Sequence, residues 1–403
     1  MSPSLADHDL FAQGVPHALF ERMRRDAPVH WTEGDGSARG FWSLTRHADI
    51  VAANKNPGTF SSAQGIRIED QSREEYLARR TFQETDPPEH TAVRRLVNPA
   101  FAKPVMARFE PTVRDLAAGI VCAALESPET DAVEAIAKPL PMMMLGRILG
   151  VPDEDLPWLV KKGDALIGNT DPDFTETLFD PADPRYAMMP FRSPAGAELY
   201  DYADDVLEGR RDVDPSGILR RMIEAGLAGR DFKNFLCLLV AAGNDTTRYS
   251  IAMALHRLAE EPQLLARIKE GDVMETAPDE FIRLASPTMH FRRTATRDVE
   301  MHGQAIRAGD KVLLWFVSGS RDEAVFERPH DAVLDRHPNR HLAFGQNGPH
   351  VCLGMWLARI EVRAVLQEIA ARVHAIEPLA PPSWTRSNFI CGVKRLPVRI
   401  TPA

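Results

Sequence analysis

The chain has 403 residues, 44% of them hydrophobic and 26% charged, and a formal net charge of −9. The length supports one large domain or two of ordinary size, and the composition is typical of a globular protein. The negative charge argues against a nucleic-acid-binding protein, which normally carries a basic stripe. No apolar run approaches the roughly 18 residues that span a membrane.

The N-terminus and the cysteines bear on where the protein works. The N-terminal residues contain neither a basic stretch nor an apolar stretch, so they do not resemble a signal peptide. The cysteines are scattered, with no pair at the spacing of a zinc site or a disulfide framework, and we expect reduced thiols in a cytoplasmic protein. These residues are Cys122, Cys237, Cys352 and Cys391.

Helical patterns dominate the chain, and strand patterns are few and short. Asp214 and Asp231 are placed to cap two of the predicted helices, and Pro262 is expected to end the longest, which would be about 45 Å long. The predicted fold is mainly α with a minor β portion, as one domain over residues 1–403. Helices are predicted over residues 111–125, 195–208, 215–225, 231–260 and 354–373, and strands over residues 40–45, 311–317 and 398–401.

A segment near residue 90 is the first to carry possible chemistry. After Asp86-Pro-Pro, His90 and Arg94 stand at i and i+4, on one face of a helix. Such a face suits the binding of carboxylates, and Arg293 and His350 would add two more donors. Taken alone, the segment is more simply explained as a solvated basic face.

The middle of the long predicted helix contains Ala242-Gly-Asn-Asp245-Thr246-Thr247. Glycine inside a helix costs about 1 kcal/mol relative to alanine, and a threonine hydroxyl can bond back to the carbonyl four residues earlier. Gly243 and Thr246 therefore predict a local opening of the helix with a polar notch, in which an acid beside an alcohol can deliver protons. The apolar residues 236–240 predict that this turn is buried; a surface turn is the alternative.

Glu280 and Arg283 lie at i and i+3 on another helical segment, where they can form an ion pair. Such pairs are common on helix surfaces and carry little information alone. The pair gains meaning only if Arg336 supplies a second cation to the same carboxylate.

The stretch from His341 to Met355 places Cys352 after a glycine-rich loop and before a strongly patterned helix. The N–H groups and the dipole at a helix N-terminus favour a thiolate, which is either a nucleophile or a ligand to a soft metal. The glycines of the stretch would let a flat macrocycle approach the backbone closely. A buried structural cysteine is the alternative. The glycines are Gly345, Gly348 and Gly354.

Phosphate-binding loops are missing from the sequence. No glycine-rich fingerprint follows a predicted strand, so no flavin or nicotinamide site is expected in this chain. If the chemistry is redox, the electrons must come from another protein.

Together these segments resemble one family over nearly the whole chain, the cytochromes P-450 in their soluble bacterial form, which are haem-thiolate monooxygenases. So many segments in the family's order make coincidence negligible and favour the functional interpretation of each. The resemblance implies the cytochrome P-450 fold, with a long central helix over the haem. The matching segments are Asp86–Arg94, Ala242–Thr247, Glu280–Arg283, Phe291–Thr296, Ser320–Asp322, His337–Gly345 and His350–Gly354.

The resemblance implies a role for each matching residue. Cys352 would be the thiolate ligand of the haem iron, with Phe344 as the aromatic residue over it. Asp245 and Thr246 would be the acid–alcohol pair that governs proton delivery. The remaining residues would hold the cofactor: the propionate binders His90, Arg94, Arg293 and His350, the haem contacts Gly345, Ala242 and Gly354, and the structural triad Glu280, Arg283 and Arg336.

The expected cofactor is therefore thiolate-ligated haem b, and the expected reaction inserts one atom of dioxygen into a C–H or C=C bond. A ferredoxin and its reductase would supply electrons, with the ferredoxin docking near Cys352 on Arg95, Arg359 and Arg363. Two alternatives stay open. A peroxide-driven peroxygenase would tend to lack the acid–alcohol pair, and a haem-based sensor would be supported by a signalling domain.

Two departures from the family pattern are visible. Residues 344–352 contain one residue more between the glycines than most bacterial members, which resembles relatives that act on sterols, terpenoids and other lipids. Residues 170–173 and 242–248 point the same way. Ala332 and Val333 stand where the family usually has Phe and Asp, which puts local packing in doubt.

By resemblance, the substrate pocket draws on residues 61–83, 165–189, the long helix, residues 287–291 and the turn at 389–390. Its expected lining is mostly apolar, which predicts a medium to large hydrophobic substrate such as a terpenoid, steroid, fatty acid or polyketide. The residues expected to line it are Ile66, Ile68, Phe82, Leu239, Ala242, Met289 and Ile390.

Overall fold

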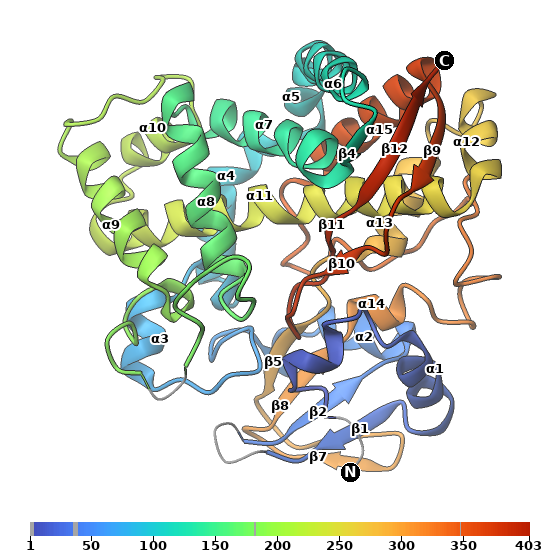
Figure 1. Ribbon diagram of the computed structural model, residues 1–403. Helices are drawn as coiled ribbons and strands as arrows, with labels where there is room; N and C mark the ends of the chain where they lie inside the picture. Colours follow the sequence, from blue (N-terminus) through green and yellow to red (C-terminus); the bar gives the residue numbers. More distant parts are fainter. Residues whose placement is uncertain (1–3, 35–38, 181–182, 347) are drawn as a thin grey trace.

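The structure is a computed structural model that describes residues 4–34, 39–180, 183–346 and 348–403. Helices make up most of this part of the chain, and short strands form small sheets at two places (Figure 1). One lies beside the N-terminal helices and the other near the C-terminus. The mainly α fold with a minor β portion is therefore as predicted.

The longest helix, α11 (Gly229–Glu260), crosses the helical part of the molecule (Figure 1). Most of its residues are buried, because other helices pack around it. It begins two residues before the predicted start, so Asp231 lies in its first turn rather than at the N-cap. Pro262 follows its end and also begins the next helix. The helices that pack on it include α7 (Pro139–Leu149), α8 (Leu156–Ile167), α9 (Pro194–Leu207), α12 (Pro262–Lys269) and α13 (Ala277–Ala285).

Among the remaining helices, those predicted over residues 111–125 and 354–373 agree with their ranges to within one residue, and the one predicted over residues 215–225 does not. The predicted start of α10 is three residues early, because the Asp214 carboxylate accepts bonds from the amide and hydroxyl of Ser216 (2.7 Å each) instead of capping the helix. These helices are α1 (His17–Asp26), α2 (His47–Asn54), α3 (Arg73–Arg79), α4 (Glu89–Val97), α5 (Lys103–Met106), α6 (Glu110–Leu125), α10 (Ile218–Glu224), α14 (Phe316–Gly319) and α15 (Met355–Arg372).

The largest sheet has the strand order β1-β2-β8-β5-β3. Its central strands β2 and β8 run parallel, with Phe41 opposite Lys311 and Leu44 opposite Leu314, and the other neighbours are antiparallel. The predicted strand over 311–317 ends early, because the chain turns into α14. The strands are β1 (Val29–Thr32), β2 (Phe41–Leu44), β3 (Phe60–Ser61), β5 (Phe291–Ala295) and β8 (Lys311–Leu314).

The remaining strands form smaller sheets. β12 pairs with β4 on one side and β9 on the other, and it contains the predicted residues 398–401. None of the helices that the structure describes is long and apolar enough to cross a membrane. These strands are β4 (Glu129–Asp131), β6 (Val299–Met301), β7 (Gln304–Ile306), β9 (Val373–Pro378), β10 (Ser383–Trp384), β11 (Val393–Arg395) and β12 (Pro397–Pro402).

Candidate functional site

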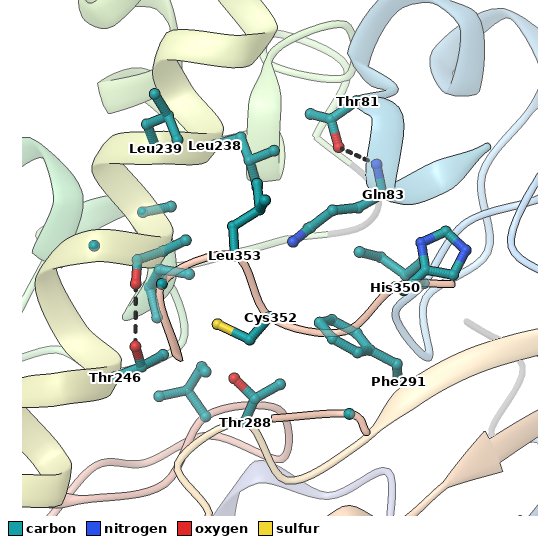
Figure 2. A pocket seen from close by; sticks show the side chains of 18 of the residues that line it. Thr81, Gln83, Leu238, Leu239, Thr246, Thr288, Phe291, His350, Cys352 and Leu353 are labelled. Atoms are coloured by element: carbon teal, nitrogen blue, oxygen red, sulfur yellow. Dashed lines mark hydrogen bonds between the residues drawn. The ribbon is translucent and has the colours of Figure 1, made fainter. Parts of the chain in front are cut away.

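A large cavity lies beside α11. At its inner end it is bounded by the cysteine loop (residues 344–352), and at its outer end by residues 65–84 and 190–192. Thr246 of α11 and Cys352 both line the inner end, and Figure 2 shows the Cys352 sulfur pointing into the space between its loop and α11. Residue 347 of the predicted motif lies outside the described residues.

The cysteine loop closes on itself before α15 begins. The Cys352 amide donates to the carbonyl oxygen of Phe344 (2.9 Å). Burial raises the pKa of the Cys352 thiol, although the amides of Gly354 and Met355 and the charge of Arg94 lower it. The sequence led us to expect that the helix N-terminus would favour a thiolate here. Burial opposes that effect and raises the pKa of the thiol. Bound iron would displace the proton, as metal ions do from coordinating thiols.

The loop glycines have different roles from the one predicted for them. Gly345 adopts a φ of +60°, which other residues rarely tolerate. A side chain at Gly348 would meet the backbone oxygen of Asn54 at 2.5 Å, so this glycine makes room for α2 rather than for a macrocycle. Only Gly354 faces the sulfur, with a Cβ position 4.0 Å from Cys352 Sγ.

Asn54 is a residue that the sequence did not single out. Its side-chain amide donates to the carbonyls of Gly345 and Gln346 (2.9 and 3.0 Å), and its oxygen accepts from Arg293 (3.1 Å). It therefore ties the cysteine loop to β5. Its position at the end of a short helix offers no local signal of this role.

The predicted His/Arg group comes together at the inner end. The His90 and His350 rings are 4.2 Å apart, and Arg94 lines the cavity and donates to the carbonyl of Val351. Arg293 is buried, and Coulomb interactions couple it to both histidines. Residues from α4, β5 and the cysteine loop thus form one basic cluster.

This basic cluster forms no ion pair with a carboxylate among the described residues, and Asp86 acts on His90 and Arg293 only through its charge at a distance. Burial, followed by neighbouring positive charge, lowers the pKa of His90 to about 4 and that of His350 to about 2, and burial lowers that of Arg293 to about 10. Both ring nitrogens of His90 and Nδ1 of His350 are buried without a hydrogen-bond partner. Buried polar atoms normally have partners, so the cluster fits an anionic group that the chain itself does not supply.

Thr246 faces the cavity, while its neighbour Asp245 does not. The Thr246 hydroxyl donates to the Ala242 carbonyl (3.1 Å; Figure 2), which is the back-bond predicted for it. Asp245 is 1% exposed, and its carboxylate accepts from Arg248 and from Asn244 (3.2 Å). Consecutive residues of a helix point about 100° apart, so the side chains of Asp245 and Thr246 face different surroundings.

Asp245 belongs to a buried ion cluster between α11 and α8. Arg248 bridges it to Asp164, which accepts at 2.8 Å, and Asn244 donates to the same Asp164 oxygen (2.7 Å). Burial raises the pKa of Asp245, the charge of Arg248 opposes this, and that of Asp164 adds to it. The carboxyl is therefore able to carry a proton nearer neutral pH than an ordinary aspartate.

The helix is not opened at Gly243, contrary to the prediction. α11 is continuous through this turn. A side chain at Gly243 would meet Leu145 of α7 at 2.6 Å, so close helix packing is the reason for the glycine. The turn was predicted to be buried, and this holds for Asn244, Asp245 and Thr247, whereas Ala242, Gly243 and Thr246 line the cavity.

Glu280, Arg283 and Arg336 form the predicted triad. Arg283 makes two bonds of 2.8 Å to the Glu280 carboxylate, and Arg336 approaches it to 3.0 Å. Both members of the first pair are 0% exposed. Burial alone would raise the pKa of Glu280, but Arg283, the Val333 amide and Arg336 together hold it below its usual range. Val333 contributes its backbone here, and Phe326 packs under both guanidinium groups (5.1 and 5.6 Å).

Some of the predicted substrate contacts line the cavity, and others do not. Two of them do not line it: Ile68 and Met289 pack instead in a separate core cluster with Trp315. Met289 alternates with its neighbour Thr288, which does line the cavity, because successive side chains of an extended segment point to opposite sides. The predicted residues that do line it are Ile66, Phe82, Leu239, Ala242 and Ile390.

The cavity also holds polar residues that the sequence did not indicate. The Gln83 side chain extends into it (Figure 2), and Arg67, Arg79 and Arg192 line its outer end. Glu361 of α15 lines it as well; burial raises the pKa of this carboxyl to about 8, and Oε1 has no hydrogen-bond partner. No motif marks these residues, because they are brought together from separate segments.

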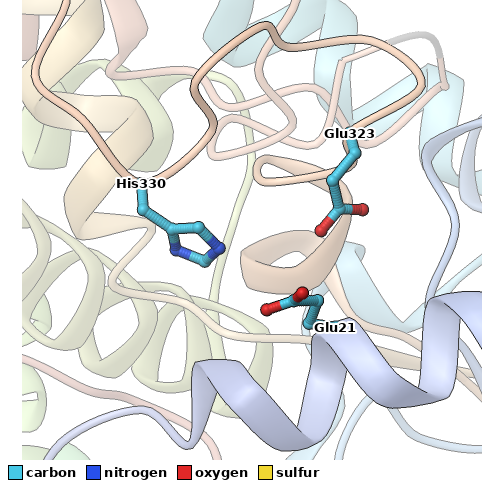
Figure 3. A group of neighbouring side chains, drawn as sticks. All are labelled: Glu21, Glu323 and His330. Atoms are coloured by element: carbon cyan, nitrogen blue, oxygen red, sulfur yellow. The ribbon is translucent and has the colours of Figure 1, made fainter.

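A second group of possible metal ligands lies outside the cavity. Glu21, Glu323 and His330 converge on the surface (Figure 3). Arg24 already donates to both Glu323 oxygens, at 3.0 Å through Nε and 2.5 Å through Nη2. We therefore interpret this group as an ion-pair cluster rather than a cation site.

Comparisons with known proteins extend over nearly the whole chain. A family model described as Cytochrome P450 matches residues 198–372. The chain is 34% identical to linalool 8-monooxygenase of Pseudomonas putida over 416 residues, which cover 99% of both proteins. It is 35% identical to the methyl-branched lipid omega-hydroxylase of Mycobacterium tuberculosis over 402 residues, or 95% of this chain and 91% of the relative.

The fold has similar solved structures. One is a cytochrome P450 of Mycobacterium marinum in complex with pseudoionone, with a TM-score of 0.88 and 32% sequence identity. The match covers 99% of this chain and 98% of the other. The similarity therefore includes both ends of the cavity.

Proposed function

The chain belongs to the cytochrome P450 family of haem-thiolate monooxygenases, and from this premise we propose that Cys352 ligates haem b at the inner end of the cavity. The observation that carries the proposal is the basic cluster with unpartnered nitrogens at the same end as the one cavity-facing thiol of the cysteine loop. We propose one catalytic domain over residues 1–403.

The residues present fit this cofactor. His90, Arg94, Arg293 and His350 would hold the two propionates, which supply the anion that the cluster lacks. Phe344, Gly345, Gly354 and Ala242 line the same space and would contact the macrocycle. The Glu280 triad would act from behind, by holding the segment that leads into the cysteine loop.

Bound haem activates dioxygen, and electron donation from the thiolate favours O–O cleavage. The protein must deliver protons and exclude bulk water. Thr246 would hold a proton at Oγ1 once its hydroxyl turns from the Ala242 carbonyl toward the cavity. Asp245 would supply that proton from the buried ion cluster, where its raised pKa lets it act as an acid. Because its carboxylate faces Arg248, this transfer needs a rotation of Asp245 or an intervening water.

We infer that the substrate is a medium-sized to large apolar molecule, into which one oxygen atom is inserted at a C–H or C=C bond. Apolar side chains form much of the cavity wall, among them Ile66, Phe82, Leu239, Phe291 and Ile390. The two relatives act on linalool and on methyl-branched lipids, which supports a terpenoid or a lipid as the substrate.

A ferredoxin, reduced by its reductase, is proposed as the electron donor, docking on the face next to the cysteine loop. Arg359 and Arg363 already pair with carboxylates there, with Asp279 at 2.7 Å and Glu110 at 2.9 Å. Arg95 is exposed and forms no ion pair with a described residue, so it would contribute most of the positive charge. The unpaired thiols support work in the cytoplasm.

The test is the carbon-monoxide spectrum of the reduced protein. The wild type should show the red-shifted Soret band of thiolate ligation, and Cys352→His should lose it. Cys122→Ser, which changes an exposed thiol on α6, is the matched control and should keep the band. An unchanged band in Cys352→His would show that another residue binds the iron.

A further inference from the structure

The outer end of the cavity contains polar and charged side chains, although its lining was expected to be mostly apolar. Three guanidinium groups line it: Arg67 and Arg79 from the segment 65–84, and Arg192 from the opposite segment. The proposed function uses none of them. Their partners show which one is available to a ligand.

Arg67 and Arg192 are already neutralised by carboxylates. Arg67 pairs with Glu69 at 3.0 Å and packs over the rings of Phe191 and Phe389 at 5.3 and 5.0 Å. Arg192 pairs with Glu75 at 2.5 Å, which joins the two outer segments. These contacts explain both side chains as parts of the cavity wall.

Arg79 differs, because its described hydrogen bonds go to neutral acceptors. Nη2 donates to the Gln71 side-chain oxygen (2.6 Å) and Nε to the Glu75 carbonyl (3.3 Å), and it has no ion pair with a described residue. Burial lowers the pKa of Arg79 and the charge of Arg192 lowers it further, while the more distant charges of Glu75 and Glu84 only partly oppose them. An anion beside this guanidinium would relieve both effects.

Glu84 does not take this place. It lines the same end, but its carboxylate accepts the Thr81 amide (3.3 Å), and burial raises its pKa. No ion pair joins it to Arg79. The cavity wall thus presents a half-buried cation that Glu75 and Glu84 influence from a distance but that forms no ion pair with a described carboxylate.

Arg79 is held at a defined distance from the inner end. The Asn234 amide of α11 donates to the carbonyls on either side of it, at Ala78 and Arg80 (3.1 Å each). Thr246 lies twelve residues further along the same helix, which corresponds to roughly 18 Å. Between the two levels α11 presents Leu238 and Leu239 to the cavity.

We propose that Arg79 binds a carboxylate at one end of the substrate, and that the apolar remainder lies along α11 with its other end at the inner end of the cavity. The substrate class is therefore an amphipathic organic acid, with oxidation far from the carboxylate. This inference rests on the proposed function for the reaction, but not for the binding of the acid.

The test compares acids with their neutral analogues. Dodecanoic acid and dodecanol, and farnesoic acid and farnesol, are titrated into the haem-loaded wild type and followed by the haem absorption shift. In at least one pair we expect the acid to bind about ten- to hundredfold more tightly, as for one charge-assisted hydrogen-bonded contact. Added salt should weaken the binding of the acid and leave the affinity for the alcohol unchanged.

Arg79→Gln should remove the preference for the acid without lowering the affinity for the alcohol, and Arg79→Lys should keep part of that preference. Arg73→Gln, on the exposed part of the same helix, is the matched control and should bind like the wild type. Equal affinity for acid and alcohol in both wild-type pairs, or an equal loss of both ligands in Arg79→Gln, would overturn the proposal. Calorimetric titration of the same proteins reports the acid contact independently of haem, so a failure of the haem assignment remains distinguishable.

Discussion

The two ends of the cavity are built in different ways. At the inner end, residues from α2, α4, β5 and the cysteine loop surround the Cys352 thiol and leave imidazole nitrogens without partners. At the outer end, the short helix α3 and the segment 190–192 meet through the ion pair Arg192–Glu75. The difference indicates that the chemistry is held by a rigid, buried frame, while the choice of substrate lies in surface segments that are able to vary.

The supports of the two ends also differ in burial. The Glu280–Arg283 pair behind the cysteine loop is wholly buried, and its loss would leave an unpaired charge in the interior. The outer pair Arg192–Glu75 is less completely buried, with side chains 9% and 12% exposed, so water can partly solvate a partner left unpaired. Mutations at the two ends should therefore separate stability from substrate handling.

The largest effect is expected from Glu280→Gln, which breaks the frame of the inner end. Arg283 would remain buried without its carboxylate, and the free energy of unfolding should fall by about 3–5 kcal/mol. Urea denaturation of the haem-loaded protein measures this loss. Glu275→Gln removes a carboxylate that is 82% exposed and pairs with Arg363, and it should change stability by less than about 0.5 kcal/mol. Equal losses in both variants would contradict the comparison.

Thr246→Ala should separate chemistry from haem binding at the inner end. Without the hydroxyl, proton delivery loses a hydrogen-bonding group, and product formed per electron consumed should fall roughly tenfold. Hydrogen peroxide should account for the lost electrons, while the haem spectrum persists. Thr246→Ser keeps the hydroxyl and should recover most of the coupling. Unchanged coupling in the alanine variant would remove Thr246 from the proton path.

Glu361→Gln tests whether the buried, cavity-lining carboxyl destabilises the folded protein as pH rises. Burial raises the folded-state pKa of Glu361 to about 8, so the folded protein retains a proton that the unfolded chain releases. The wild type should lose stability as pH rises toward 8, with a slope of up to about 1.4 kcal/mol per pH unit. The variant lacks this term, so its advantage over the wild type should grow between pH 5 and pH 8. Parallel stability curves would show that the carboxyl is solvated.

A smaller effect on stability than that of Glu280→Gln is expected from Glu75→Gln at the outer end. It removes the carboxylate that pairs with Arg192 but keeps an acceptor for the Ser72 amide. The free energy of unfolding should fall by less than the about 3–5 kcal/mol expected for Glu280→Gln, because the Arg192 and Glu75 side chains are 9% and 12% exposed rather than wholly buried. Release of a bound substrate, followed by stopped-flow absorption, should become several-fold faster. A large loss of stability would show that both ends belong to one frame.

Sequence patterns predicted the helices well where periodicity is strong. The predicted ranges of α6, α9, α11 and α15 deviate by one or two residues, because apolar spacing reports which face is buried. The start of α10 was wrong, since Asp214 bonds locally to Ser216 instead. Local competition of this kind depends on a side-chain rotamer that spacing does not specify.

The sequence motifs also identified residues that lie together at the inner end, where His90 and His350 meet although they are 260 positions apart in the sequence. Asn54, Arg79 and Glu361 were missed, since each acts through contacts with segments that carry no motif. The reason for Gly348 was misread in the same way: the close neighbour is Asn54.

Composition and motifs were sufficient to identify the reactive groups: a thiol at a helix start, a basic cluster, and an acid beside an alcohol. Their orientation followed from packing alone. Asp245 and Thr246 are adjacent in the chain, yet one joins Arg248 and Asp164 while the other faces the cavity. A helix turns about 100° per residue, so which neighbour meets the substrate depends on the elements that cover its other sides. Those elements, α7 and α8, are contributed by distant parts of the chain.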